Sequence, residues 1–331
     1  MRILKFTAAM VLAAQPALAD IVFTSWGGTT QDAQTEFWAA PFAATGTKVV
    51  QDGPTDYGKL KAMVEGGATA WDVVDVEFDY ALQAGADGLL EPLDFTVIDK
   101  AALDPRFVSD YAVGSFYYAF VLGYNPAAFA DKPATLADLF DLEKFPGKRT
   151  FYKWAAPGVL EAALIADGVA PDALYPLDLD RAFRKLDTIK SEIIWWTGGA
   201  QSQQLLASGE APIGFFWNGR LAALQADGED VGIVWDQNIT AADALVVPKG
   251  TKNKAEAMRF IAAATSAQAQ ADFAAATGYA PINTGSPALM DPAVRATLPD
   301  AHGESRIDAD MAWWAAHREE IGNRWYAWQA E

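Results

Sequence analysis

The chain has 331 residues, of which 51% are hydrophobic and 21% charged, a composition typical of a globular protein of about two domains. It contains no cysteine, which excludes disulfides, thiolate catalysis, iron–sulfur clusters and a lipid-anchored cysteine, and its two histidines, His302 and His317, argue against a Ser-His-Asp triad or a multi-histidine metal site. The net charge of −18 argues against a nucleic-acid partner and weakly favours cationic or neutral small ones.

The N-terminus has the pattern of a secretory signal peptide. Arg2 and Lys5 precede an apolar stretch over 6–14, and the small-x-small pattern at 17–19 leads into Asp20. We predict a signal peptide over 1–19 that is cleaved after Ala19; a buried N-terminal helix is the alternative. No later run reaches the roughly 18 apolar residues of a membrane span. We therefore expect a free protein in the periplasm.

Strand-like and helix-like patterns alternate along the first part of the chain. Short β-type runs are expected at 21–25, 48–51 and 72–76, and helices at 29–42, 57–65 and 79–86. This alternation favours a parallel sheet covered on both faces.

The remaining chain continues the alternation without a repeat or a flexible linker. An amphipathic segment at 136–148 ends at a Pro-Gly turn, and further elements are expected at 159–166, 179–190, 202–208 and 212–217. A strand near 243 is followed by a loop and then by a long Ala-rich helix over 255–276. Two lobes without a linker indicate a chain that crosses between them more than once, as in a hinged cleft.

Residues that directly follow the strands are the candidate ligand contacts, because ligands of open α/β sheets lie beyond the carboxyl ends of the strands. Trp26, Gly27 and Gly28 follow the first strand; the glycines would let backbone N–H groups approach a ligand, although a tight turn explains them equally well. Glu77, flanked by Asp75 and Asp79 at a spacing of two, could hold a metal ion or an ammonium group. A solvated strand end with a helix cap is the alternative.

Trp217, Arg220 and Asp243 form a second group of candidates. Trp217 directly precedes Asn-Gly-Arg, and an aromatic face beside a carboxylate suits an alkylammonium ion. Arg220 could clamp a carboxylate while Asp243 takes an ammonium, so that the pair would recognise both ends of a small zwitterion. A salt bridge between Arg220 and Asp243, or a surface position for Arg220, is the alternative.

The common enzyme motifs are absent from the sequence. It has no G-x-S-x-G elbow, H-E-x-x-H, Walker loop or G-x-G-x-x-G. Paired carboxylates for hydrolysis stay open, because 43 acidic residues always provide pairs. Tyr117 and Tyr118 could bind ferric iron in principle, but their apolar, strand-like surroundings favour packing.

Several stretches, taken together and in this order, resemble the periplasmic solute-binding proteins of ABC importers, and most closely the spermidine/putrescine-binding family. They are FTSWGG, WDVVDVEFDYALQAGADGLLEPLD, VGSFYYAFVLGYN, LFDLEKFPGK, WWTGGAQSQQLLASGEAPIGFFWNGR, IVWD with DALVVPKGTKNKAEAMRFI, and GYAPIN. Together they span most of the chain after residue 19.

The resemblance implies an α/β fold of the type II periplasmic-binding kind, with two lobes, each a mixed and mostly parallel sheet flanked by helices, and a ligand cleft between them. Crossovers near Ala119 and Asp243 would divide the chain into one lobe of 20–118 plus 243–287 and another of 119–242 plus 288–331. By matching motifs, Trp26, Trp217, Asp243 and Tyr279 would line the cleft, with Asp243 holding an amine.

Some residues depart from the pattern of polyamine binders. Trp154 stands where a carboxylate is expected, whereas Arg220 resembles the arginine of relatives that bind γ-aminobutyrate (GABA). The leading prediction is a non-enzymatic, monomeric binding protein without cofactor or metal, which delivers a small aliphatic amine such as putrescine or spermidine to an inner-membrane ABC permease. An ω-amino acid such as GABA is the alternative ligand. If the ligand is a diamine instead, Glu77 could serve as the second carboxylate. A hydrolase with paired carboxylates, or a binder of sugars or ferric iron, represents the other classes.

Overall fold

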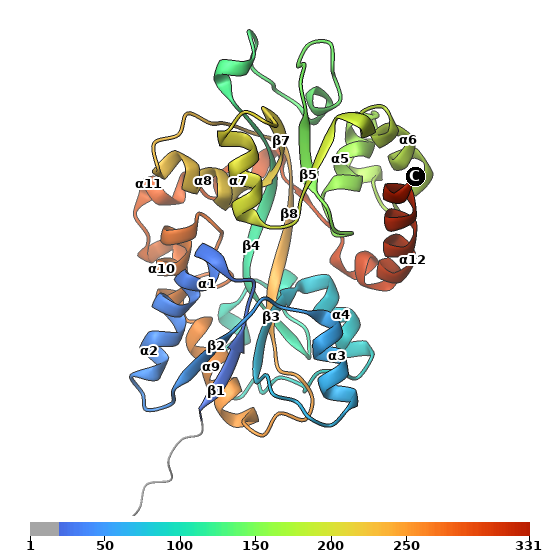
Figure 1. The fold of residues 1–331 in the computed structure, drawn as a ribbon. Helices are drawn as coiled ribbons and strands as arrows, with labels where there is room; N and C mark the ends of the chain where they lie inside the picture. The colour runs from blue at the N-terminus through green and yellow to red at the C-terminus, as the bar shows by residue number, and fades with distance from the viewer. Residues whose placement is uncertain (1–19) are drawn as a thin grey trace, which may run out of the picture.

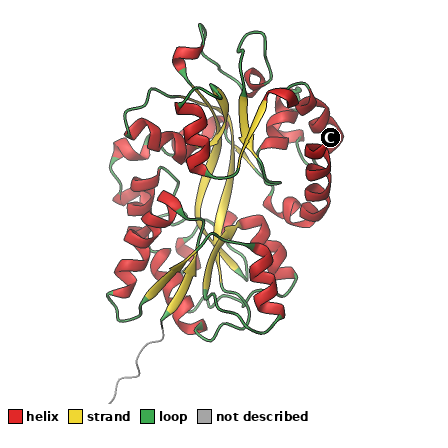
Figure 2. Cartoon of the chain, viewed as in Figure 1, coloured by secondary structure: helices red, strands yellow, loops and turns green. Residues whose placement is uncertain are grey.

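The computed structural model describes residues 20–331, so the predicted signal peptide lies outside the described residues. The chain forms two lobes, and a mixed β-sheet runs through both with helices on its two sides (Figure 1, Figure 2). This confirms the predicted two-lobed α/β fold. Between residues 20 and 331, no helix is long and apolar enough to cross a membrane.

The sheet has nine strands, eight of which follow the order β2-β1-β3-β8-β4-β7-β5-β6, and β9 pairs with β8. The strands are β1 (Ile21–Thr24), β2 (Val49–Asp52), β3 (Val73–Glu77), β4 (Ala112–Tyr124), β5 (Arg149–Tyr152), β6 (Ile193–Trp196), β7 (Ile213–Trp217), β8 (Gly232–Val246) and β9 (Ile307–Asp308). The strands β1, β2 and β3 are parallel to one another, as are β5, β6 and β7, whereas β8 is antiparallel to β3 and β4, and β4 to β7. The simple parallel sheet expected from the alternation is therefore wrong in the middle of the sheet.

The two long strands β4 and β8 explain this mixed topology. They have 13 and 15 residues, and both extend through the two lobes (Figure 1). All residues of β4 are buried, in agreement with its nearly uninterrupted apolar sequence. Because the two strands lie side by side, the chain passes between the lobes within a continuous sheet. The crossover points near Ala119 and Asp243, and the lobe boundaries built on them, stay a prediction.

The helices cover both faces of the sheet. The longer ones are α1 (Gly28–Gln34), α3 (Tyr57–Glu65), α4 (Phe78–Ala86), α5 (Val159–Ala166), α6 (Leu179–Asp187), α7 (Gly199–Ala207), α8 (Asn218–Ala226), α9 (Lys254–Ala264), α10 (Ala267–Thr277) and α12 (Met311–Ala330), with short α2 (Ala40–Ala43) and α11 (Pro292–Arg295). The helix expected over 29–42 is divided by a π-helical stretch, Thr35–Ala39. The segment 136–148 contains only a short 3-10 helix, Leu136–Leu139.

The Ala-rich segment predicted as one helix over 255–276 is two helices, α9 and α10. The break lies at Thr265 and Ser266, where the Ser266 side chain accepts a hydrogen bond from the Ala269 N–H and caps α10. The Asn283 side chain donates to the carbonyl of Thr265 at 2.9 Å. Serine favours a helix N-cap over a helix interior, so a single polar residue interrupts the alanine pattern.

The C-terminal helix α12 is held against the lobe that contains β5 and α5. Three of its tryptophans donate indole hydrogen bonds: Trp314 to Glu161 at 2.6 Å, Trp325 to the Lys153 carbonyl at 2.7 Å, and Trp328 to Asp187 at 2.7 Å. All three side chains are buried. The tryptophans that crowd the end of the sequence are therefore packing residues with satisfied polar atoms.

Candidate ligand-binding site

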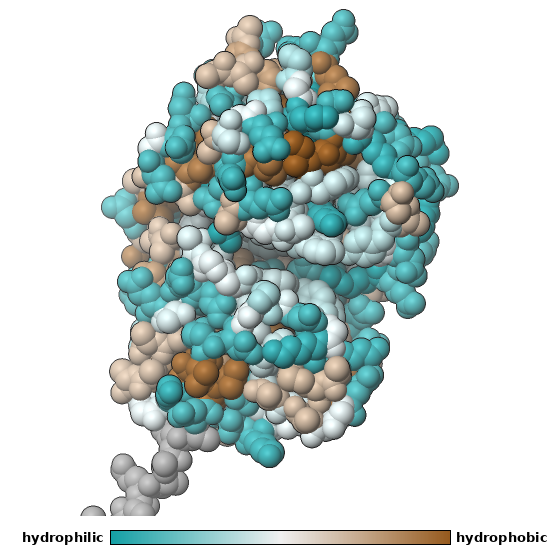
Figure 3. Space-filling model, viewed as in Figure 1, coloured by the Kyte–Doolittle hydropathy of each residue, from teal (hydrophilic) through white to brown (hydrophobic). Residues whose placement is uncertain are grey.

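A cavity of about 530 Å³ is lined by residues from both halves of the sheet. Seven predicted site residues line it: Trp26, Glu77, Trp154, Trp217, Arg220, Asp243 and Tyr279. The space-filling view shows the region where the two lobes meet as mainly hydrophilic and neutral, with separate hydrophobic areas on either side (Figure 3). Residues that are far apart in the sequence thus converge on one cavity.

Gly27 and Gly28 are not among the residues that line the cavity. Both have positive φ angles, 77° and 59°, a conformation that glycine adopts without strain, and they form the turn from β1 into α1. The backbone N–H of Gly27 donates to the side chain of Gln31 at 2.9 Å. The two glycines shape the turn next to Trp26, as the alternative explanation for them stated.

Arg220 is held at the start of α8 and reaches toward the start of α1. Its two terminal nitrogens donate to the hydroxyl groups of Thr29 at 2.7 Å and Thr30 at 2.9 Å, so it does not use them on Asp243. A Cβ atom at Gly199 would lie only 2.0 Å from Nε of Arg220. A glycine at the start of α7 therefore leaves the space in which the guanidinium lies.

Three buried N–H donors around the cavity have no hydrogen-bond partner within the described chain. They are Nε of Arg220 and the indole Nε1 atoms of Trp26 and Trp217. A buried donor without an acceptor costs about 1–3 kcal/mol, so such groups normally have a partner. The N-terminal end of α7, which carries a partial positive charge, lies beside Arg220 and adds to the positive potential there. This part of the cavity is suited to an anionic or strongly accepting group.

Asp243 provides the opposite charge in the same cavity. Its side chain is 7% exposed, and no cation pairs with it in the described residues. Burial raises the pKa of Asp243 well above its ordinary value, and the charges of Asp75 and Glu77 raise it further, while the neighbouring Trp26 indole opposes them. A carboxylate in such surroundings is stabilised by a cation that enters the cavity.

Glu77 lies opposite Asp243 on the adjacent strand, but it already has a cation. Nη2 of Arg318 lies 2.5 Å from Oε2 of Glu77, and the other terminal nitrogen of Arg318 pairs with Asp79. The hydroxyl group of Tyr57 donates to Glu77 at 3.1 Å. Burial raises the pKa of Asp79 to about 6, and the charge of Arg318 opposes this rise.

The third acidic residue of this group, Asp75, faces a separate buried network. It accepts hydrogen bonds from Ser115 at 2.7 Å, from Gln34 at 2.5 Å and from Ser25 at 3.4 Å. Burial raises its pKa to about 7, and these hydrogen bonds oppose the rise. The strand ends at Glu77, and Asp79 lies in the first turn of α4, so the three carboxylates do not form one row. Among residues 20–331, no group of His, Asp or Glu has the arrangement of a metal site.

Aromatic rings form most of the remaining wall. Trp217 contacts Trp196 and Tyr152 with ring centroids 4.7 and 5.0 Å apart, and Tyr279 stacks on Phe116 at 5.0 Å. At the cavity's edge the half-exposed rings of Trp154 and Tyr326 meet edge to face at 6.3 Å. Aromatic faces beside a carboxylate attract ammonium groups by a cation–π interaction of about 2 kcal/mol when desolvated.

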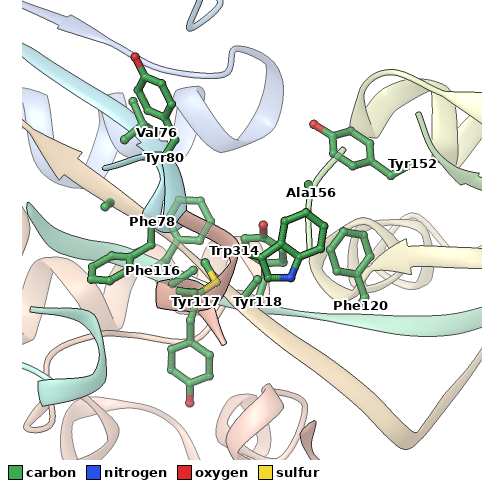
Figure 4. Packing of buried hydrophobic residues seen from close by; sticks show 14 of the residues in the cluster. Val76, Phe78, Tyr80, Phe116, Tyr117, Tyr118, Phe120, Tyr152, Ala156 and Trp314 are labelled. Atoms are coloured by element: carbon green, nitrogen blue, oxygen red, sulfur yellow. The ribbon is translucent and has the colours of Figure 1, made fainter. Parts of the chain in front are cut away.

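Tyr118 is a cavity residue that packing arguments from the sequence did not predict. It is one of the lining side chains, whereas its neighbour Tyr117 contacts Phe107 and donates its hydroxyl hydrogen to Asp300. Figure 4 shows both rings among the buried aromatic residues of β4 and its surroundings. Because successive side chains of a strand point to opposite faces, only one of the two tyrosines can face the cavity.

Other lining residues that the sequence analysis missed are Tyr57, Tyr152, Thr197, Gly199, Arg318 and Tyr326. Arg318 is the most informative of them, because it brings a charge. It lies four residues after Trp314 and seven before Trp325, so it belongs to the buried stripe of α12. An arginine on the buried side of a helix is the sequence signal that would have identified it.

Comparison with known proteins places this chain in a family. The family model of bacterial extracellular solute-binding proteins matches residues 39–299. The gamma-aminobutyric acid-binding protein of Pseudomonas aeruginosa is 37% identical, over 99% of this chain and 96% of its own. The spermidine/putrescine-binding periplasmic protein of Escherichia coli K12 is 25% identical over 81% of this chain and 82% of its own.

Solved structures agree with this comparison. The structure of a GABA receptor is 69% identical, with a TM-score of 0.91, and the match covers 94% of this chain and 98% of that one. An ABC transporter substrate-binding protein from Bradyrhizobium japonicum USDA 110 is 38% identical, with a TM-score of 0.88 and coverage of 94% and 99%. These names are those of receptors and binding proteins, which speaks against the hydrolase alternative, and the polyamine binder is the more distant relative. The chain belongs to the family of bacterial extracellular solute-binding proteins.

Proposed function

We propose that this protein is the substrate-binding component of an ABC transporter and that its ligand is a short ω-amino acid, for which GABA is the best candidate. The observation that carries the proposal is the presence, in one cavity, of a buried carboxylate without a cation and of an arginine with an unpartnered N–H. The carboxylate is Asp243 and the arginine is Arg220. This reverses the order of the sequence prediction, in which a polyamine came first.

Each end of the ligand meets a group of opposite charge. The ammonium group takes the place beside Asp243, where charge-assisted hydrogen bonds and the surrounding aromatic faces stabilise it. The carboxylate accepts a hydrogen bond from Nε of Arg220, a buried donor that has no other acceptor among the described residues. The short aliphatic segment between the two charges lies against aromatic side chains.

The relatives support the ω-amino acid over the polyamine. The GABA-binding relative and the GABA receptor structure are 37% and 69% identical to this chain, whereas the spermidine/putrescine-binding relative is 25% identical. The charges of the cavity also favour an ω-amino acid over a polyamine. Glu77, the candidate partner for a second ammonium, is already paired with Arg318.

The mechanism of capture follows from the position of the cavity. Arg220 lies at the start of α8, just after β7, and Asp243 lies in β8. Trp26 follows β1 and Glu77 ends β3, so a bound ligand contacts residues from both halves of the sheet. Ligand contacts that form only when the two lobes are close together stabilise a closed form of the protein, in which the lobes enclose the ligand. The closed complex then delivers the ligand to a membrane permease from the periplasm, with the protein acting as a monomer.

Calorimetric titration of the mature protein with four related ligands tests the proposal. GABA carries both charges, butyrate lacks the amine, butylamine lacks the carboxylate, and putrescine replaces the carboxylate with a second amine. We expect GABA to bind at least about 30-fold more tightly than any of the other three, because an unpaired buried charge costs about 2–5 kcal/mol. Equal or tighter binding of putrescine would overturn the assignment of the ligand.

A further inference from the structure

A three-residue ionic cluster closes one wall of the cavity. The guanidinium of Arg318 pairs with Glu77 at 2.5 Å and with Asp79, and all three side chains are largely buried, with exposed fractions of 16%, 10% and 0%. Arg318 and Glu77 line the cavity, and Asp79 lies behind them. The cluster joins α12 to the strand β3 and the helix α4, which come from opposite ends of the sequence.

The position of this cluster relative to Asp243 gives it a role in selecting the ligand. Glu77 and Asp243 are direct neighbours across the antiparallel pair of β3 and β8, so their side chains are on the same face of the sheet. Without Arg318, these two carboxylates would form a site for two ammonium groups. We propose that Arg318 is a specificity-determining residue that occupies the place of a second ligand ammonium and thereby excludes diamines. This inference rests on the proposed function.

Arg318 is held too firmly for a ligand to displace it easily. Its guanidinium carbon lies 5.3 Å from the ring centre of Tyr57 and 5.6 Å from that of Tyr80, and these two rings stack on each other at 3.6 Å. The helix that carries it is fixed by the indole hydrogen bonds of Trp314 and Trp325. Moving the guanidinium away would leave Asp79 and Glu77 buried without a cation.

Because of this cluster, the two carboxylates that line the cavity are not equally available to a positively charged ligand group. Once Asp243 holds one ammonium group, the remaining charged side chains that a ligand meets are Arg220 and the Arg318–Glu77 pair. A carboxylate is attracted by Arg220, whereas a second ammonium is repelled by both arginines. Among the described residues, Glu77 is the other carboxylate that lines the cavity, and Arg318 acts by occupying it so that a second ammonium of a diamine cannot.

Two variants of the mature protein test the proposal by calorimetric titration with GABA and with putrescine. Arg318→Met exposes both carboxylates, and the double variant Arg318→Met with Asp79→Asn removes one cation and one carboxylate, so the net charge of the cluster stays the same. We expect both variants to bind putrescine at least tenfold more tightly than the wild type. Thermal unfolding verifies that they fold, and the double variant keeps the test valid if the single one is unstable.

Two further variants separate this role from general loosening of the site. Adding Glu77→Gln to the double variant removes the carboxylate that Arg318 covers and should abolish the gained putrescine affinity. Arg324→Met, on the same helix but in an exposed pair with Asp180, should change neither affinity. A wild type that binds GABA, with variants that gain no putrescine affinity, overturns the role of Arg318 alone. A wild type that binds no ω-amino acid overturns the proposed function itself.

Discussion

Glu77 and Asp243 lie directly opposite each other on adjacent antiparallel strands, and among residues 20–331 a cation pairs with Glu77 but none with Asp243. Both residues are buried, with 8% and 7% of the residue surface exposed. The two neighbouring carboxylates thus differ in charge compensation, because Glu77 has the arginine as a partner and Asp243 does not. This difference is why we propose Asp243 as the partner of a positively charged ligand group.

Replacing Asp243 with asparagine should remove GABA binding almost completely. The change keeps the shape of the side chain but deletes the charge that pairs with the ligand ammonium. We expect affinity to fall at least about 30-fold, since an unpaired buried charge costs about 2–5 kcal/mol. Calorimetry measures the change, and Asp236→Asn, at an exposed position of the same strand, serves as the control. Retained affinity in Asp243→Asn would contradict its assigned role.

Replacing Arg220 with methionine should weaken GABA strongly and leave butylamine little changed. The variant loses the guanidinium that pairs with the ligand carboxylate, and it also loses the hydrogen bonds to Thr29 and Thr30. We expect a loss of at least about 30-fold for GABA and less than about threefold for butylamine. The control is Arg184→Met, at an exposed position of α6. Equal losses for both ligands would point to a structural role of Arg220 instead.

Replacing Gly199 with alanine should disturb the site through Arg220. The new methyl group would lie 2.0 Å from Nε and 2.4 Å from Cζ of Arg220, so the guanidinium has to move. We expect GABA affinity to fall at least tenfold, equivalent to about 1.4 kcal/mol, while the fold is retained. Gly303→Ala, where nothing lies within 4 Å of the added atom, is the matched control. Unchanged affinity in Gly199→Ala would show that the position of Arg220 is unimportant for the ligand.

Stability and binding should respond to pH in opposite directions. Burial raises the pKa of Asp75 from 3.8 to about 7, so between these values the folded protein retains a proton that the unfolded chain releases. The free energy of unfolding of the ligand-free protein should therefore decrease as the pH rises from about 4 to about 7. Thermal unfolding over this range measures the slope. Asp75→Asn should flatten it, because the titrating group is then absent.

GABA binding should instead become tighter as the pH rises. The ligand ammonium, with a pKa near 10, stays charged over this range, while the raised pKa of Asp243 means that a proton has to leave the carboxyl group before the pair forms. Calorimetry at pH 5.5 and pH 8 should give the higher affinity at pH 8. An affinity that does not depend on pH would contradict an ionised Asp243 in the complex.

Much of the fold was predictable because local patterns determine it. The helices at Tyr57–Glu65 and Val159–Ala166 have the bounds expected from the sequence, and the first three strands differ by about one residue. The direction of the central strands was not predictable, since it depends on β4 and β8 lying side by side over their whole length. Periodicity describes one segment at a time and contains no information on its neighbours.

The candidate site was predictable where its residues lie at the ends of strands or just after them. Trp26, Glu77 and Trp217 are of this kind, and all line the cavity. Arg318 was missed because it comes from a helix 241 residues after Glu77, and its role exists only through that contact. The sequence could not decide the role of Gly27 and Gly28, because a turn with positive φ angles and a ligand-binding loop have the same sequence pattern.

The last helix of the chain has a consequence for the order in which the site is completed. A chain that ended before Met311 would retain nearly the whole sheet together with Arg220 and Asp243, but it would lack Arg318 and Tyr326 from the cavity wall. A polypeptide that emerges with its N-terminus first therefore has both charges proposed for recognition before it has the wall proposed to restrict the choice of ligand. A C-terminal truncation or an appended tag that prevents docking of α12 should yield a receptor that is less selective rather than one that is merely less stable.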